Sequence, residues 1–599
     1  MSTSVKRILK VTGLVLVSLI LILYFFAVDD FLEYMVKQRL HSYINNTPDR
    51  LYDISYETLD ISLADRAVRA GKISVLPRKQ AIDSMRNDHL SMLMSVEVDS
   101  FYFDGLGLFK LLVLNKLEIN EVVASRPVVK YYFNREAKTP PQEGKVVDNV
   151  FSDKLKHAFL HRFKVDNGQY YAIRLPIEDS VYFRMDSSSL LIDEISIDPS
   201  QKNPFKMVVF DSLQFISGRF YGGFVENYRI DARSIEVSTK RKLLRIDSLV
   251  FRPKHFSMAD TSVQFGHDIF MINTDAIEFK GLDFKEAKGN NDIYIRNINI
   301  NKPDFKVSTD KRLPKNMDRK PLFGEMLRKI NVPFGVDTLE ITDGRVLYHE
   351  TVGGQKPPLN MLFTEVDLMG VNITNDSILL SENPEMKLNI RAKFLDAGDL
   401  SLYVEVPVLS EKDKMKVRAK LGPMSFKPVS EMLEGPLQVR FLSGKINSME
   451  TEFIADTKHS SGHLYLDYSD MKIQIFKEKM TTQGEKEKEK WFLNAIVNTV
   501  VKTNNHKDDI NFASGLIEYD RPEDIGVPGY VFQSLKEGLL TTMMPEKRHA
   551  DEAKEKKKEI SEEKKEQKQV EKEEQAEEKV SEKEKKKEKR KSEKKAKKK

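Results

Sequence analysis

The residues able to do chemistry are scattered along this chain, and none falls into a recognised catalytic or metal-binding motif. His157 and His161 stand four residues apart and would share one face of a helix, but Ala158 occupies the place that glutamate takes in the zinc-protease pattern HExxH. We therefore expect a solvated or core-edge pair of histidines rather than a zinc site. Gly218 to Phe224 lacks the GxGxxG spacing of a phosphate-binding loop.

The acidic pairs and the absence of cysteine narrow the chemistry further. Asp193 with Glu194 and Asp508 with Asp509 are neighbours in a chain with 91 acidic residues, so they say nothing of catalysis without a cleft and a shifted pKa. With no cysteine, the chain has no disulfide, thiolate metal site or cysteine nucleophile. We expect that the protein is not an enzyme and holds no cofactor or metal. An exported chain without disulfides suits a bacterial cell envelope.

A hydrophobic span from Ile8 to Val28 is long enough to cross a bilayer, since about 20 apolar residues suffice. Lys6, Arg7 and Lys10 precede or begin it and Asp29 follows it, which predicts a cytoplasmic N-terminus. A cleaved signal peptide is the alternative, but the span is long and lacks a small-x-small cleavage site. We expect a cytoplasmic stub and single-pass inner-membrane anchor at residues 1–28, with the bulk of the chain in the periplasm. The anchor residues are Leu14, Val15, Leu16, Val17, Leu19, Ile20, Leu21, Ile22, Leu23, Phe25 and Phe26.

All of the net positive charge lies in the last 50 residues. They hold 21 of the 96 basic and 16 of the 91 acidic residues, which leaves 75 of each in the rest of the chain. The main body is therefore not built to bind nucleic acid. Residues 546–599 are too poor in apolar side chains to pack into a domain, so we expect a Lys/Glu-rich tail that is disordered, a lone helix or a coiled coil. A second and more specific hypothesis is that the basic end of this tail contacts anionic lipid or polysaccharide.

Most of residues 29–477 alternate apolar and polar side chains with period two, which is typical of strands with one dry face. Turn residues interrupt the runs at short intervals, and no long amphipathic helices alternate with them. The pattern favours a mainly β chain with a long antiparallel sheet, and argues against a doubly wound α/β enzyme. The clearest runs cover residues 386–394, 402–408 and 415–421.

The strand region also contains imperfect internal repeats. Residues 117–129, 244–256 and 295–305 each run from a strand through a short apolar step to proline. Residues 163–173 resemble 339–348, where Gly168 and Gly344 precede an aromatic strand. Repetition with drift predicts a sheet that grows by adding similar units.

The end of the main body has a different pattern. Residues 478–490 are a polar connector, and residues 491–545 read as helix, strand and helix. The helices are expected at Trp491 to Thr503 and Tyr530 to Met544. Capping an open end of the sheet is the simpler interpretation of both, and docking on a membrane or partner is the alternative.

Several of these features resemble the AsmA-like family of bacterial envelope proteins, with its TamB-type relatives and shorter Bacteroidota-type members. They are the N-terminal span, the step from Leu117 to Val129, and the Gly-containing strands that start at Leu442, Ser461 and Ala513, before Val527-Pro528-Gly529-Tyr530. The resemblance covers most of residues 1–545 but not the tail. It implies a membrane-anchored periplasmic β-groove that handles or transfers phospholipid and supports outer-membrane maintenance.

An apolar sheet face must either close as a packed core or line a groove, because exposing it costs roughly 25 cal/mol per Å². Three hypotheses follow: a phospholipid-handling groove, an anchored scaffold or assembly factor that binds outer-membrane assembly proteins, and an envelope enzyme. For the groove, ordinary core packing is the competing explanation of each lining residue. The candidate lining residues are Met386, Leu388, Ile390, Phe394, Leu402, Val404, Val406, Val408, Met415, Val417 and Leu421.

Overall fold

The structure is a computed structural model that describes most of the region between residues 51 and 543. In the part of the chain that it describes, no helix is long and apolar enough to cross a membrane. The predicted anchor, the polar connector, most of the predicted helix at Trp491 to Thr503 and the charged tail lie outside it. The described residues are 34, 51–62, 65–105, 116–134, 136–137, 157–175, 181–197, 208–223, 227–254, 268–282, 293–353, 356–475 and 501–543.

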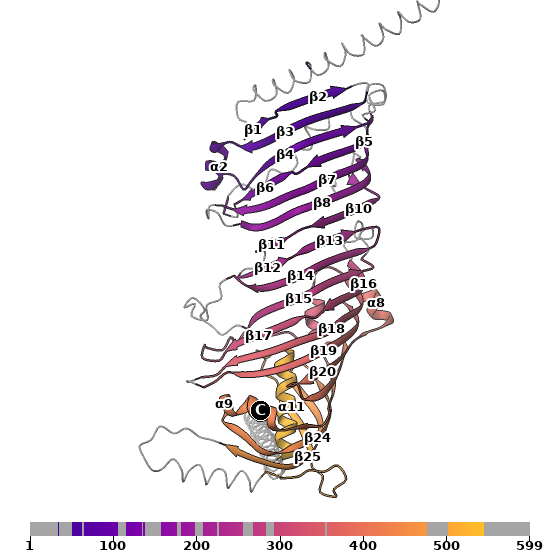
Figure 1. The fold of residues 1–599 in the computed structure, drawn as a ribbon. Coiled ribbons are helices and arrows are strands. Elements are labelled where there is room, and N and C mark those ends of the chain that lie inside the picture. The colour runs from indigo at the N-terminus through magenta and orange to yellow at the C-terminus, as the bar shows by residue number, and fades with distance from the viewer. Residues whose placement is uncertain are drawn as a thin grey trace, which may run out of the picture. The chain divides into compact units, whose positions relative to one another are not determined.

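The described residues are mainly β-strand, in a long mixed sheet of many strands with few helices (Figure 1). The chain divides into two compact units, residues 1–419 and 420–599. The boundary falls inside the predicted β-region rather than at the polar connector.

In unit 1 the strands lie side by side in nearly sequential order (Figure 1). The first half holds β1 (Tyr52–Ser55), β2 (Thr58–Ser62), β3 (Ala67–Pro77), α2 (Lys79–Arg86), β4 (Met92–Asp104), β5 (Lys116–Ser125), β6 (Val128–Phe133), β7 (His157–Arg174), β8 (Val181–Ile197), β9 (Val208–Val209), β10 (Ser212–Ser217) and β11 (Phe220–Gly222). The second half holds β12 (Tyr228–Ala232), β13 (Ser234–Ser238), β14 (Leu243–Pro253), β15 (Ile269–Lys280), β16 (Ile293–Asn301), β17 (Asp304–Asp310), α7 (Phe323–Arg328), β18 (Phe334–Thr351), β19 (Leu359–Thr374), α8 (Ser377–Glu382), β20 (Glu385–Phe394) and β21 (Gly398–Pro407).

Unit 2 contains a smaller set of strands and two longer helices. Strand β22 (Met415–Leu421) begins in unit 1 and ends in unit 2. The further elements are β23 (Met424–Ser425), α9 (Lys427–Leu437), β24 (Val439–Ala455), β25 (His459–Ile475), β26 (Ser514–Asp520) and α11 (Val527–Met543). The strands predicted at 386–394, 402–408 and 415–421 and the final helix are thus confirmed, whereas α2, α7, α8 and α9 have no counterpart in the sequence prediction.

The expectation of an antiparallel sheet is wrong at two places in unit 1. Strands β5 and β6 both pair in parallel with β7, and β16 and β17 both pair in parallel with β18. Parallel neighbours need a long connection that returns the chain to the same end of the sheet, whereas antiparallel neighbours need only a short turn. Period-two alternation is the same in both cases, so it did not reveal the difference.

The long strands of unit 1 are bent near their middle by residues in the left-handed backbone region. Each such residue bends the strand and breaks its strict alternation, so it switches the face on which the following side chains lie. None of them is glycine, so each costs about 1 to 2 kcal/mol of backbone strain. They are Lys72 in β3, Arg126 between β5 and β6, Asn167 in β7, Ser187 in β8, Ser248 in β14, Lys302 between β16 and β17, Asp343 in β18 and Glu365 in β19, with φ between 48° and 55°.

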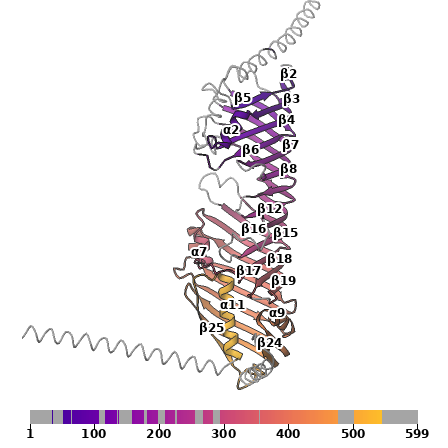
Figure 2. The same cartoon turned by 90° about the vertical axis from the view of Figure 1, so that its left-hand side faces the viewer.

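These bends lie next to one another across the sheet. The Arg126 N–H donates to Asp166 O, beside Asn167, at 2.7 Å, and the Lys302 N–H donates to Thr342 O, beside Asp343, at 2.9 Å. Register shifts flank Gly168 in β7 and Gly344 in β18. The bends therefore form a line, and in Figure 2 the strands of unit 1 run in two crossing directions, as expected of strands that change course there.

Unit 1 is a tandem duplication with a constant spacing along the chain. Strand β14 starts at Leu243, 176 residues after the start of β3 at Ala67. The bend residues Arg126 and Lys302 are also 176 residues apart. We call this difference the repeat spacing. It also relates β1 and β2 to β12 and β13, β4 to β15, and β5, β6 and β7 to β16, β17 and β18. We call residues 52–197 the first repeat and 228–374 the second repeat.

Hydrogen bonds recur at the same repeat spacing as the strands. The Tyr52 hydroxyl accepts from Met94 N at 3.3 Å, and the Tyr228 hydroxyl accepts from Phe270 N at 3.2 Å. Gly105 and Gly281 both have positive φ, 68° and 71°. The repeats at 117–129 and 295–305, and at 163–173 and 339–348, are therefore structurally equivalent, whereas residues 244–256 lie on β14, the counterpart of β3.

Candidate functional site

The candidate functional site is one face of the sheet in unit 1, where apolar side chains form continuous rows across neighbouring strands. The longest row has one residue on each of fifteen strands, and every neighbouring pair is in register. Its members are Leu59, Ala70, Phe101, Ala124, Val165, Leu190, Phe215, Val237, Leu244, Phe279, Ile298, Leu339, Gly370, Leu388 and Val404. We call it the long row.

Two further rows have the same character. A second, called the isoleucine row, consists of Ile235, Ile246, Ile277, Ile300, Ile341, Leu368, Ile390 and Leu402. A third, on the other side of the bends, is called the aromatic row and consists of Met94, Tyr131, Ala172, Phe183, Gly222, Ile230, Phe251, Ile272, Phe305, Val346, Phe363 and Phe394. The three rows contain no charged side chain.

The bends place all three rows on one face. Strict alternation would put side chains five residues apart, such as Leu244 and Leu249, on opposite faces, but the left-handed residue Ser248 returns them to the same face. The packing agrees, because Val98 on one side of a bend lies in one cluster with Ala124 and Val165 on the other side. The bent sheet thus has a single apolar face, which we call the apolar face.

The apolar face is not fully covered. In the long row only Ala124, Val165, Gly370 and Val404 are buried, and the other eleven residues are half-buried. Two members of the aromatic row, Met94 and Tyr131, are 46% and 38% exposed. A continuous apolar surface of this length that stays partly open to solvent is the usual sign of a binding surface.

The groove residues predicted from the sequence lie at one end of this face or beyond it. Leu388 and Val404 close the long row, Ile390 and Leu402 close the isoleucine row, and Phe394 closes the aromatic row. Met386, Val404, Val406, Val408, Met415, Val417 and Leu421 are buried, and Leu388, Ile390, Phe394 and Leu402 are half-buried.

Sequence reasoning missed most of the rows, which lie in β2 to β19. Their strands do not alternate strictly, because each left-handed residue shifts the pattern by one position. In β14 the apolar positions are Leu244 and Ile246 before the bend and Leu249 and Phe251 after it. A jump of three positions next to a polar residue, recurring at the repeat spacing, is the signal that identifies the face.

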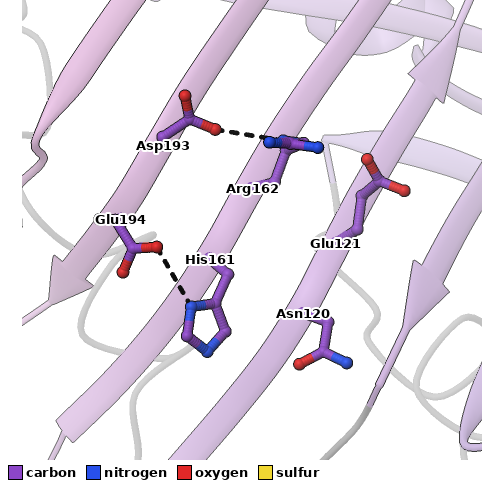
Figure 3. A pocket seen from close by; sticks show the side chains of 6 residues that line it. All are labelled: Asn120, Glu121, His161, Arg162, Asp193 and Glu194. Carbon is purple, nitrogen blue, oxygen red and sulfur yellow. Dashed lines mark hydrogen bonds and ion pairs between the residues drawn. The ribbon is translucent and has the colours of Figure 1, made fainter.

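The opposite face is polar, and its pocket near β5, β7 and β8 is lined by Asn120, Glu121, His161, Arg162, Asp193 and Glu194 (Figure 3). His161 Nδ1 lies 3.3 Å from Glu194 Oε1, and Arg162 Nε donates to Asp193 Oδ1 at 3.1 Å (Figure 3). The acidic and basic groups are thus paired with one another across strands.

The charged residues of this pocket are paired across strands rather than gathered around one point. Within the described ranges, no group of three or more His, Cys, Asp and Glu side chains is placed to hold a metal ion. His157 and His161 do not share a helix face, since both lie in strand β7. Phe220 to Gly222, inside the glycine-rich stretch, form strand β11, which pairs with β8 and β12.

The environment of two tyrosines reflects the low polarity near the apolar face. Burial raises the pKa of Tyr170, which pairs with Met185. Burial, together with a hydrogen bond to Glu350 at 2.6 Å, raises the pKa of Tyr348. The phenols of Tyr170 and Tyr348 therefore lose their protons only at a pH above that of a free tyrosine.

Comparison with known proteins gives no relative from which a function can be transferred: no family model matches the chain, and no curated protein matches it.

Proposed function

We propose that this protein handles phospholipid on the apolar face of unit 1, as an inner-membrane-anchored periplasmic protein that supports the outer membrane. The observation that carries the proposal is the long row, which stays apolar and partly exposed on fifteen successive strands. Acyl chains are recognised by continuous apolar surface and need no specific polar partner. A surface that repeats from strand to strand also lets a chain move along it without a large change in free energy.

The membrane location rests on the sequence. The span from Ile8 to Val28 would keep one end of the chain in the inner membrane, where phospholipid is available. The resemblance to AsmA-like proteins points to the same activity. Transfer on such a face needs no catalytic residue.

The test compares two substitutions in strand β16 that differ only in the face on which they fall. Ile298 lies in the long row, and Asn299 faces the opposite side, where it pairs with Glu278 and Glu340. We expect Ile298→Lys to lower at least threefold the phospholipid that copurifies with the full-length chain in mild detergent, measured by mass spectrometry. Asn299→Lys, which adds the same charge, should leave it unchanged.

The control is an unrelated protein with one membrane-spanning segment, purified in the same way. Equal phospholipid in both variants, or no excess over this control in a folded sample, would reject the proposal. In that case the scaffold hypothesis becomes the better one, and a stoichiometric outer-membrane assembly partner in pull-downs would support it.

A further inference from the structure

The connection between the parallel strands β17 and β18 forms a strap, which we define as residues 311–333. It must return the chain from the end of β17, at Asp310, to the start of β18, at Phe334, so it runs from one edge of the bent sheet to the other. It contains the short helix α7, which Figure 2 shows to one side of strands β15 to β19.

The first end of the strap is fastened to side chains on the rim of the apolar face. Lys320 Nζ lies 3.5 Å from Asp268 Oδ2, and Lys311 Nζ lies 3.8 Å from Glu350 Oε2. Asp268 and Glu350 lie two residues from Phe270 and Tyr348, which pair with Val307 between them. They therefore share the apolar face with these residues.

The second end is fastened at the opposite edge. The Arg328 guanidinium donates to Val408 O and lies 2.8 Å from Asp413 Oδ1. The Asn375 side-chain amide donates to Ile330 O at 2.8 Å and to Val332 O at 3.1 Å. Both contacts lie near the start of β18, so the strap is tied at both edges of the sheet.

The middle of the strap is held in shape by its own charges. Arg319 forms two hydrogen bonds of 2.7 Å with the Glu325 carboxylate, and Lys329 Nζ lies 2.8 Å from it. These hydrogen bonds from Arg319 and Lys329 lower the pKa of Glu325 to about 2. Leu322 is only 1% exposed, whereas Met317 is 73% exposed and Met326 is 49% exposed. The strap thus buries Leu322 and leaves Met317, Met326, Ile330 and Val332 exposed.

We propose that the strap is a gate across the apolar face in the second repeat, closed by the ionic contacts at its two ends. This inference rests on the proposed function, because it regulates the same face. The two lysine contacts at the first end are partly exposed to solvent, where ion pairs stabilise only weakly, so this end of the strap can open and close on a functional time scale. Acyl chains that move along the rows would pass the strap only when it is released.

The contact between Lys320 and Asp268 at the first end of the strap belongs to the second repeat. At the repeat spacing, the counterpart of Asp268 is Met92, which pairs with Phe133 and carries no charge. The first repeat therefore has no counterpart of the Lys320–Asp268 contact.

The test uses the absence of natural cysteine, which allows two introduced thiols to be joined selectively. Lys320→Cys with Asp268→Cys is bridged by a bifunctional thiol reagent in the full-length chain. Ser55→Cys with Ser74→Cys, a pair in β1 and β3 whose hydroxyls lie 2.7 Å apart, is the matched control. The probe is fluorescently labelled phosphatidylethanolamine in vesicles of phosphatidylethanolamine and phosphatidylglycerol.

We expect bridging at 320 and 268 to slow exchange of the probe at least tenfold and reduction of a cleavable bridge to restore it, while the control bridge has no effect. Lys320→Glu with Arg328→Glu should speed exchange and raise hydrogen exchange in residues 311–333. If wild type exchanges the probe and the bridge leaves the rate unchanged, the gate is rejected and the proposed function stands. If wild type binds no probe, the proposed function fails and the gate fails with it.

Discussion

At the scale of single residues, several polar side chains lie where the strands of unit 1 bend. Lys72, Arg126, Asn167, Lys302 and Asp343 are polar residues inside strands or between paired strands, which a propensity argument would count against the strands. They occupy the left-handed backbone region where the chain must bend, and their side chains stay on the solvent side of it. Arg126 Nε, for example, donates to Asp99 Oδ2 at 2.6 Å across the line of bends.

One charged cluster in unit 2 makes stability depend on pH. His459 in β25 lies 2.6 Å from Glu518 and 2.8 Å from Asp520 of β26, and its backbone N–H donates to Asp456 at 3.0 Å. Burial alone would lower the pKa of His459, but the hydrogen bonds to Glu518 and Asp520 outweigh it and raise the pKa. The protonated imidazole therefore joins the two strands.

We predict that His459→Gln costs about 1 kcal/mol of unfolding free energy at pH 6, where the exposed pairs limit the gain. A folded pKa above the unfolded value of about 6.5 means that this stability is complete below that pH and is lost as the pH rises through the folded pKa. Denaturant unfolding of both proteins at pH 6 and pH 9 measures the difference. A difference of the same size at both values would contradict the prediction.

At the scale of elements, the last helix packs largely through small side chains. The helix predicted at Tyr530 to Met544 contains the apolar residues Val531, Phe532 and Leu535. In α11 Phe532 is 45% exposed, and small side chains let the helix approach β26 closely, so α11 caps that part of the sheet in unit 2. The buried residues of α11 are Val527, Tyr530, Ser534, Gly538 and Thr542.

The contact that permits this approach is between Gly515 in β26 and Gly538 in α11. A Cβ atom on Gly515 would lie 1.9 Å from Gly538 O and 2.4 Å from Thr542 Oγ1. We predict that Gly515→Ala lowers the unfolding free energy of unit 2 by about 3 kcal/mol, because the helix has to move away. Gly353→Ala is the control, since its Cβ would meet nothing within 4 Å, and it should change stability by less than about 0.5 kcal/mol. Equal effects in thermal unfolding would show that the close approach does not matter.

At the scale of the whole molecule, the duplication in unit 1 makes a prediction about length. Tyr52 and Tyr228 occupy the same place in the two repeats, so joining residue 51 to residue 228 removes exactly one repeat spacing and preserves every register. We expect this shortened chain to fold with an unchanged strand content per residue and a shorter apolar face. Circular dichroism and cooperative unfolding measure the first, and copurifying lipid per chain measures the second.

The control for this deletion joins residue 98 in β4 to residue 276 in β15. It removes one residue more than the repeat spacing, so the side chains after the junction fall on the opposite face of the sheet, and we expect this chain to aggregate or to unfold without cooperativity. If both shortened chains fold equally well, the repeats are not interchangeable structural units, and the repeat spacing has no role in the fold.

The sequence by itself determined what depends on neighbours along the chain. Alternation of Met386, Leu388 and Ile390 with the polar residues between them predicted β20, and the similarity of residues 163–173 to 339–348 marked equivalent strands. A strand buries one face whatever its partner is, so period two survives in the sequence. The span at Ile8 to Val28 and the charged tail are equally local features, and they stay predictions.

Only the tertiary structure decided what depends on neighbours across the sheet. Parallel and antiparallel pairing leave the same alternation, so the two crossovers and the strap appear only when β17 is seen beside β18. Whether Leu244 and Phe251 share a face depends on a single left-handed residue, Ser248, whose φ does not follow from period-two alternation. The apolar face is therefore a property of register and bends, because each residue in a row meets its neighbour from another strand, often far away along the chain.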